Sequence, residues 1–208
     1  MKELYLSFVF SMVWWIHCVA QSDYSKVHPE EGAKLKVVEE MLNGTDELVL
    51  LMAKNGSSIL GKTQCWTSKK LHSTVLGIPH CLGYWQQRKN EVRGKPWHKK
   101  KLHATYAVGL ANGNPAISAA VSGTKRPRIA SAISGIYGIF YANHTEKCFV
   151  VGLKGIGDNE SCALWVKLKN LDKPHSSCIF GFNSTCSAPG TPVYHHNSSL
   201  CTSNKNVQ

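Results

Sequence analysis

Cysteine is the residue type whose number and spacing most restrict the chemistry of this chain. The sequence has eight cysteines, of which Cys18 lies near the start. The other seven lack the paired C-x-x-C spacing of a structural zinc site, so we predict disulfides and no metal. Seven cysteines form at most three bridges and leave one thiol. They are Cys65, Cys81, Cys148, Cys162, Cys178, Cys186 and Cys201.

Histidines and carboxylates are the residues that could carry out acid–base catalysis. The chain has ten histidines and thirteen Asp and Glu residues. They form no H-E-x-x-H motif and no paired-carboxylate pattern, and the chain also lacks a nucleophile elbow. The sequence therefore predicts a protein that is not an enzyme and that carries no cofactor.

The distribution of charge says more than the net charge of +11. Thirteen Lys and Arg residues lie between Lys62 and Arg128, with Glu91 as the one acid among them. From Val92 to Thr145 there is no carboxylate at all. Any structure that this stretch builds must therefore lack negative charge.

The start of the chain is typical of a secreted protein. Lys2 precedes an apolar run from Leu4 to Ile16, and Cys18-Val19-Ala20 then places small residues where a signal peptidase cuts. The run is shorter than the ~20 residues that a membrane-spanning helix needs. We predict a signal peptide over 1–20, a single domain over 21–201, a polar tail over 202–208, and an extracellular protein without a membrane span.

Six N-x-S/T sequons support this location, because N-linked glycans attach to exposed turns of secreted chains. The predicted glycosylation sites are Asn43, Asn55, Asn143, Asn159, Asn183 and Asn197.

The secondary structure that the sequence predicts is a helix followed by strands. Residues 29–42 begin with Pro29, carry Glu30 and Glu31 in the first turn and have apolar residues at helical spacing, which predicts an amphipathic helix. Short apolar or alternating runs follow, separated by turn residues, and indicate an antiparallel barrel or sandwich of eight strands. The predicted strands are Glu47 to Ala53, Gln64 to Lys69, Cys81 to Gln87, Lys100 to Leu110, Ala116 to Ser122, Ile129 to Ala142, Cys148 to Leu153 and Cys162 to Leu168.

The C-terminal third resembles a known family. The segments "EKCFVVGL", "SCALWVKL", "KPHSSCIFGFNSTC" and "YHHNSSLC" are similar to those of the tick salivary lipocalins of the histamine-binding protein family. The match is close over residues 140 to 201 and coarse elsewhere. The resemblance implies a mainly β fold, an eight-stranded antiparallel up-and-down lipocalin barrel with an N-terminal helix and a C-terminal helix packed outside.

The resemblance also implies a pairing of the cysteines. The three bridges would join Cys65 to Cys201, Cys148 to Cys178 and Cys162 to Cys186. Cys81 would then remain as a buried, inert thiol, with an intermolecular disulfide as the alternative.

The function implied by the resemblance is sequestration of a small host mediator, which would help a tick to evade host defence. Family members that hold histamine or serotonin commonly have an acidic residue before the Leu-Trp pair, and can also have one after the cysteine that opens the preceding strand. Here these positions are Ala163 and Phe149. Because a buried ammonium needs an anion to pair with, we favour a hydrophobic lipid or eicosanoid over a biogenic amine.

Aromatic and aliphatic residues of the strands are the candidates for lining the pocket. Trp165 would serve either core packing or ligand contact, with Ala163 on the same strand face and Leu164 and Val166 on the other. Arg128 would either lie at the surface or pair with a ligand carboxylate. The ligand-binding candidates are Tyr106, Tyr137, Phe140, Phe149, Trp165 and Arg128, with Ile117, Ile133, Ile139, Tyr141 and His103 as further wall residues or polar contacts.

The basic stretch 86–103 has two interpretations. It forms either a solvated outer surface or a patch that binds a glycosaminoglycan or an acidic host protein. In the second case the protein would be an inhibitor of a host complement, clotting or signalling protein. We expect a monomer and no nucleic-acid partner.

Overall fold

The computed structural model describes seven segments of the chain, which are residues 27–54, 62–72, 77–87, 97–122, 127–153, 161–186 and 194–203. The predicted signal peptide lies outside the described residues, as do Asn55, Asn159 and residues 204–208 of the predicted tail.

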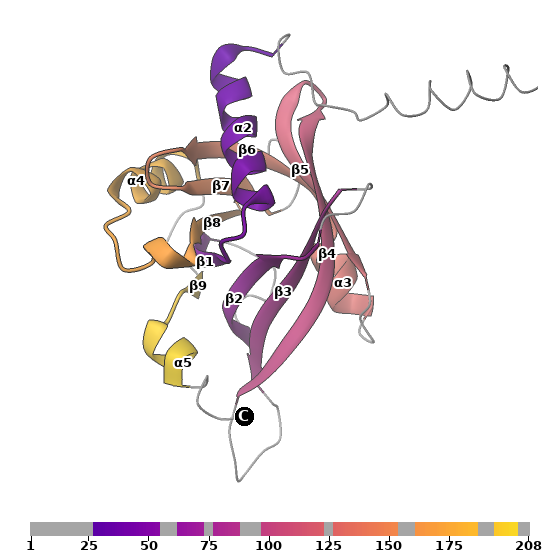
Figure 1. The fold of residues 1–208 in the computed structure, drawn as a ribbon, viewed down its shortest axis with the longest axis vertical. Helices are drawn as coiled ribbons and strands as arrows, with labels where there is room; N and C mark the ends of the chain where they lie inside the picture. The colour runs from indigo at the N-terminus through magenta and orange to yellow at the C-terminus, as the bar shows by residue number, and fades with distance from the viewer. Residues whose placement is uncertain are drawn as a thin grey trace, which may run out of the picture.

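The architecture is a closed antiparallel barrel of eight strands, as predicted (Figure 1). Each strand pairs with the next along the chain from β2 to β8; β1 pairs with β8 and also, through Leu48 and Val49, with β2, which closes the sheet. The strands are β1 (Leu48–Lys54), β2 (Thr63–Lys70), β3 (Ile78–Gln87), β4 (Trp97–Ala111), β5 (Asn114–Ser122), β6 (Gly135–Asn143), β7 (Cys148–Gly152) and β8 (Cys162–Lys167).

The alternation of side chains along β4 shows why these runs form barrel strands. Leu102 and Ala104 are buried inside, whereas Lys101 and His103 are exposed outside, which is the period of two that a strand imposes. β4 ends in a two-residue turn to β5 at Asn112 and Gly113, whose φ angles are 52° and 78°. Asn-Gly is the preferred sequence for a hairpin turn with two positive φ angles.

One predicted strand, Ile129 to Ala142, is wrong in its first part. Residues Pro127–Ile133 form the helix α3, and β6 begins only at Gly135. Ile129 and Ile133 are four residues apart, a spacing that puts both on one face of a helix and equally on one face of a strand, so it does not separate the two structures. Pro127 suits a first helical turn, since a proline there loses no internal hydrogen bond.

The predicted N-terminal helix is confirmed as α2 (Pro29–Asn43). It packs against β4, β5, β6 and β7 at one end of the barrel. Leu35, Val38 and Met41 are buried beneath it. The carbonyl of Leu42 accepts a hydrogen bond from Nε2 of His80 at 2.9 Å, which ties the end of the helix to β3.

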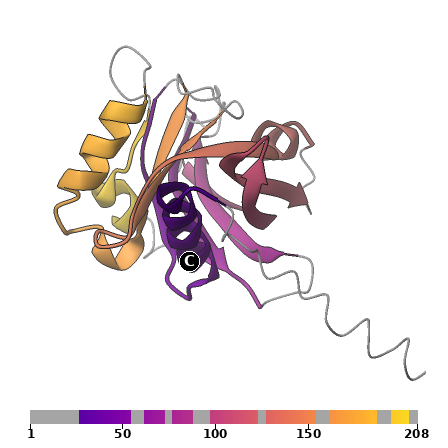
Figure 2. The ribbon, with the colours of Figure 1, turned by 90° about the horizontal axis from the view of Figure 1, so that it is seen from above.

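The predicted C-terminal helix is confirmed as α4 (Ser176–Thr185), which follows the short 3-10 helix η3 (Leu168–Asn170). It packs outside the barrel against β6, β7 and β8 (Figure 2). A second apolar core forms between α4 and the outer faces of these strands, with Val150, Leu164 and Phe182 at its centre. The outer faces of β7 and β8 are therefore buried as well.

Three disulfides hold the C-terminal part of the chain to the barrel. They join Cys65 to Cys201, Cys148 to Cys178 and Cys162 to Cys186, which are the pairs that the resemblance implies. Cys81 is the free thiol among the described residues, but it is only partly buried, contrary to our expectation. The pleat of β3 turns Leu82 and Tyr84 inward, and Cys81 therefore faces outward.

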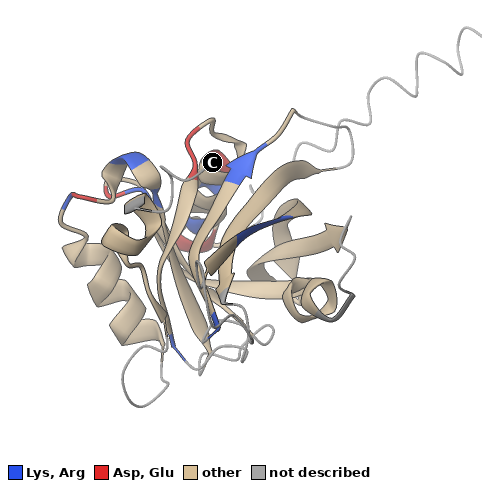
Figure 3. Ribbon diagram, turned by 90° about the horizontal axis from the view of Figure 1, so that it is seen from below, with Lys and Arg blue, Asp and Glu red and all other residues tan. Residues whose placement is uncertain are grey.

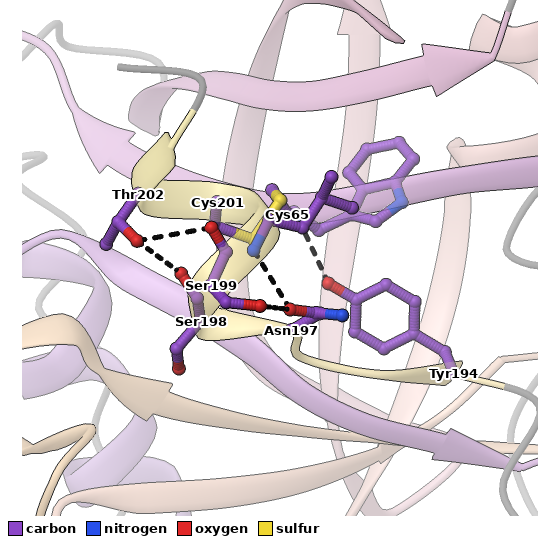
Figure 4. Close-up of a disulfide and its surroundings, with 9 residues drawn as sticks. Cys65, Tyr194, Asn197, Ser198, Ser199, Cys201 and Thr202 are labelled. Atoms are coloured by element: carbon purple, nitrogen blue, oxygen red, sulfur yellow. Dashed lines mark hydrogen bonds between the residues drawn. A yellow bond between two sulfur atoms is a disulfide. The ribbon is translucent and has the colours of Figure 1, made fainter. Parts of the chain in front are cut away.

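The end of the described chain adds two elements that the sequence analysis missed, β9 (Tyr194–His195) and α5 (Ser198–Ser203). β9 pairs with Met52 and Ala53 of β1, beyond the point at which β1 pairs with β2. The hydroxyl of Tyr194 accepts a hydrogen bond from the Trp66 amide at 3.2 Å, and Cys201 of α5 is bonded to Cys65 (Figure 4). The chain end thus fills the gap between β1 and β2.

Candidate ligand cavity

The barrel encloses a cavity between α2 at one end and α3 near the other. It has a volume of about 120 Å³.

The lining residues come from all eight strands of the barrel, from α2 and α3 and from Leu153 just after β7, and nearly all are apolar. They are Leu42, Leu48, Leu50, Trp66, Ser68, Leu82, Tyr106, Ile117, Ala119, Val121, Ile133, Tyr137, Phe149, Val151, Leu153, Ala163 and Trp165.

Charged side chains are absent from the described lining. None of the nine strands in the described part of the chain contains an Asp or Glu. The acidic residues that the structure describes lie on α2 and in turns, where Figure 3 colours the ribbon red. The absence of carboxylates that the sequence shows between residues 92 and 145 thus extends to the whole described wall.

A buried polar cluster interrupts the apolar wall near α2. Ser68 of β2 and His80 of β3 are both buried, and the Ser68 hydroxyl lies 2.8 Å from Nδ1 of His80. The ring of His80 meets that of Tyr106 edge-on, with 5.0 Å between their centroids. Burial lowers the pKa of His80, the hydrogen bond to the Leu42 carbonyl opposes this shift, and the charge of Lys70 adds to it.

Two tyrosines bring hydroxyl groups to the wall. Burial raises the pKa of Tyr106 to about 12, although a hydrogen bond with Ser68 lowers it, and the nearby Tyr137 raises it further. Tyr137 donates a hydrogen bond to the carbonyl of Ile133 at 2.7 Å, and burial raises its pKa too. Both phenols therefore stay neutral at physiological pH.

Trp66 forms part of the wall on the β2 side. Its ring stacks on Tyr84 with 4.4 Å between centroids, and its indole N–H donates to the hydroxyl of Thr63 at 2.8 Å.

Four of the predicted ligand-binding residues, Tyr106, Tyr137, Phe149 and Trp165, line the cavity together. The same is true of Ile117 and Ile133. Phe149 and Ala163, the two positions at which the resemblance leads us to look for the acid of an amine binder, are also in the wall. An acidic side chain at either position would therefore face a ligand.

Phe140 and Tyr141 lie outside the described cavity lining. An irregularity in the pairing of β6 with β7 falls at Phe140, so that Ile139 faces Val151 and Tyr141 faces Val150. Phe140 and Tyr141 both pack into the outer core. The Tyr141 ring lies so close to Gly181 of α4 that a Cβ there would come within 2.6 Å of it.

The other predicted residues do not join the described lining. Ile139 is buried in the core, and His103 is exposed on the outer face of β4. Arg128 belongs to α3, and its side chain lies outside the described residues.

Four residues at or beside the cavity are not among those predicted from the sequence, namely Leu42, Trp66, Ser68 and His80. Alternation along β2 was a usable signal for Trp66 and Ser68, which are two residues apart. No local signal marks His80, because its role depends on the register between β2 and β3.

One group of side chains outside the cavity has the composition of a metal site, namely Glu146, His175 and Cys178. Cys178 is in a disulfide, however, and the two carboxylate oxygens of Glu146 each accept a backbone N–H from the first turn of α4, at 3.0 Å. This group is a helix cap, and it gives no support to a metal.

The predicted glycosylation sites differ in exposure. Asn43, Asn183 and Asn197 are exposed. Asn143 is half-buried, and its side chain accepts a hydrogen bond from the Glu146 amide and donates one to the hydroxyl of Tyr141.

Among the residues described, no helix combines the length and the apolar character needed to cross a bilayer.

Comparisons with known proteins give one family and one fold. The model of the family described as tick histamine binding protein matches residues 86–203, more than half of the chain. The solved structure of Japanin from Rhipicephalus appendiculatus bound to cholesterol is similar, with a TM-score of 0.54 and 20% sequence identity, and the match covers 75% of this chain and 95% of that one. At this identity the likeness shows the fold alone. Among curated proteins no match was found.

Proposed function

Because the chain belongs to the tick histamine-binding protein family, we propose that it is a secreted lipocalin that sequesters a small apolar mediator of the host. The ligand would occupy the barrel cavity and would be a lipid or an eicosanoid. Removing such a mediator at a feeding site would help the tick to evade host defence. The role is one of binding, not of catalysis.

The observation that carries this proposal is the uncharged wall of the cavity. A histamine or serotonin ammonium would lose its hydration there without meeting a carboxylate, at a cost of several kcal/mol. An apolar chain gains about 0.8 kcal/mol for each CH₂ that leaves water. The described wall thus disfavours an amine and favours a hydrocarbon.

The size of the cavity restricts which apolar ligands fit. Its volume of about 120 Å³ lies below the roughly 300–1,000 Å³ of typical small-molecule sites. A slender acyl chain therefore demands less movement of the walls or the mouth than a bulky ring system does.

Isothermal titration of the recombinant protein against arachidonate, a leukotriene, cholesterol, histamine and serotonin tests the proposal. We expect binding of an apolar ligand and none of the amines. Submicromolar binding of histamine would contradict it.

A pair of variants locates the site. Ala119→Phe projects a ring into the cavity and should abolish binding, because Ala119 lines the wall. Ala107→Phe on the same sheet is the control, since Ala107 is exposed on the outer face of β4. Equal affinities for the two variants would exclude the cavity as the site.

A second candidate function rests on the outer face of β4. Lys99 and Lys101 are exposed there and have no ion-pair partner in the described part of the chain. These unpaired charges favour an acidic polymer or an acidic host protein as an additional partner.

A further inference from the structure

Helix α4 exposes two large apolar residues on the side that faces away from the barrel. Phe180 is 73% exposed, the highest value among the exposed large hydrophobic residues that the structure describes, and Ile179 is 37% exposed. The opposite side of the helix is buried, since Cys178 and Phe182 have no exposed area. Phe180 thus presents most of a phenyl ring to water.

The helix cannot turn this side inward, because α4 is fixed near both of its ends. Cys178 is bonded to Cys148 of β7, and Cys186, which follows the last residue of the helix, is bonded to Cys162 of β8. Both carboxylate oxygens of Glu146 accept amide protons of the first turn. Whatever covers Phe180 must therefore lie outside the barrel and its outer core.

Asn183 stands directly above this apolar pair on the same helix. It opens the sequon Asn183-Ser184-Thr185 and is exposed. Ile179 and Phe180 precede it by four and three residues, the spacings at which helix residues are neighbours, with about 5–6 Å between their Cβ atoms. Helical side chains lean toward the preceding turn. The side chain of Asn183 therefore leans over Phe180 and Ile179.

The side chain of Asn183 is also free to adopt this direction. The structure describes four sequon asparagines, and the side chains of Asn43, Asn143 and Asn197 are held by hydrogen bonds. In the described part of the chain the side chain of Asn183 has no such bond.

We propose that Phe180 is the contact surface for the first sugar of a glycan on Asn183. That sugar is N-acetylglucosamine, whose ring has a face of C–H groups and an apolar acetyl methyl group. The negative face of a phenyl ring attracts such groups, and the contact removes apolar area from water on both sides. The inference rests on the proposed function only in requiring secretion, because N-linked glycans are added to secreted chains.

The experiment uses the full chain secreted from human cells that add high-mannose glycans. Endoglycosidase H then leaves one N-acetylglucosamine on each occupied asparagine. Mass spectrometry of the peptides should find this sugar on Asn183. In the NMR spectrum the protons of this sugar should lie upfield of their usual positions, because they sit over the ring, and Phe180→Leu should remove the shift.

Thermal melts measure the same contact by a mutant cycle. Asn183→Gln should lower the melting temperature by about 2–4 °C, the shift expected in a chain of this size when a contact as strong as an aromatic pair is lost. In the Phe180→Leu background the same change should cost less than about 1 °C, since no ring remains to be covered.

Asn43→Gln is the matched control, because Asn43 is also a helical sequon asparagine. The residues three and four positions before it are Glu40 and Glu39, which offer no ring. The effect of Asn43→Gln on the melting temperature should be the same with and without Phe180→Leu.

The outcomes separate this inference from the proposed function. If Asn183 is bare while other sequons carry sugar, or if Asn183→Gln has equal effects in the two backgrounds, the inference is wrong and secretion stands. If the chain is not secreted at all, both fail. A glycosylated dimer that Phe180→Leu separates would make a second copy of the chain the partner of this surface and would also overturn the inference. Ligand binding is measured independently, because α4 lies outside the barrel.

Discussion

Trp165 is one of the two tryptophans in the cavity wall, with Trp66, and its removal is the simplest test of ligand contact. Burial of a large apolar side chain contributes about 1.5–3 kcal/mol, so Trp165→Ala should weaken binding of an apolar ligand roughly ten- to hundredfold. Trp85→Ala is the control, because Trp85 pairs with Lys99 at a position of β3 that faces outward. Calorimetric titration of both variants measures the difference. Similar affinities would assign Trp165 to packing alone.

His80 gives the stability of the protein a dependence on pH. The pKa of His80 in the folded protein is below the ordinary histidine value of 6.5, so the unfolded chain binds the proton more readily. The stabilisation is therefore present above pH 6.5 and is lost as the pH falls below that value. Urea unfolding between pH 7.5 and 5 should show this loss, and His80→Gln should show less of it.

His103→Gln is the control for this pH dependence, because His103 is exposed on the outer face. An unchanged pH dependence in His80→Gln would show that His80 is not its source.

Among individual residues, part of the cavity lining is predictable from the sequence. The positions of Tyr106, Tyr137, Phe149 and Trp165 follow from apolar alternation along strands. The position of Phe140 does not follow in this way. The irregularity in β6 shifts the alternation of side chains between the two faces of the strand, and no residue type in the sequence marks where it occurs. The Ser68–His80 contact depends on strand register, which a single strand's pattern leaves open.

Among the elements, α4 depends on a residue that lies in the turn before β7. Burial alone would raise the pKa of Glu146, but hydrogen bonds from Ser177 and the Cys178 amide outweigh it and lower the pKa. Glu146→Gln should therefore reduce the free energy of unfolding by about 1 kcal/mol, a typical value for a helix cap. The stabilisation should be lost as the pH falls below 4.5 through the lowered pKa.

Asp172→Asn is the control for α4, since Asp172 is exposed in the turn that precedes the helix. Urea midpoints of the two variants provide the measurement, and equal midpoints would exclude the cap.

The elements themselves differ in how well the sequence predicts them. Helix α2 and seven strands carry their periodicity, their turns and their end signals in the local sequence. Helix α3 is too short for its period to stand out from that of the adjoining strand. Strand β9 has two residues, and only its pairing with β1 creates it.

For the whole molecule, the net charge of +11 predicts attraction to acidic polymers. If the outer face of β4 concentrates this effect, Lys99→Glu with Lys101→Glu should elute from heparin at a lower salt concentration than Lys36→Glu with Lys173→Glu. The two pairs change the net charge equally, and all four lysines are exposed. Identical elution of the two variants would mean that only total charge matters.

The position of β9 has a consequence for biosynthesis. Strands β1 and β2 are synthesised early. On the edge of β1 that faces β2, however, Met52 and Ala53 receive their pairing partners only when Tyr194 and His195 have been synthesised. Until then Met52 and Ala53 present unpaired backbone groups, and such edges recruit strands from other chains. Oxidation of Cys65 with Cys201, 136 residues apart, would lock this late-arriving strand in place. A nascent chain stopped before residue 194 should therefore self-associate through β1.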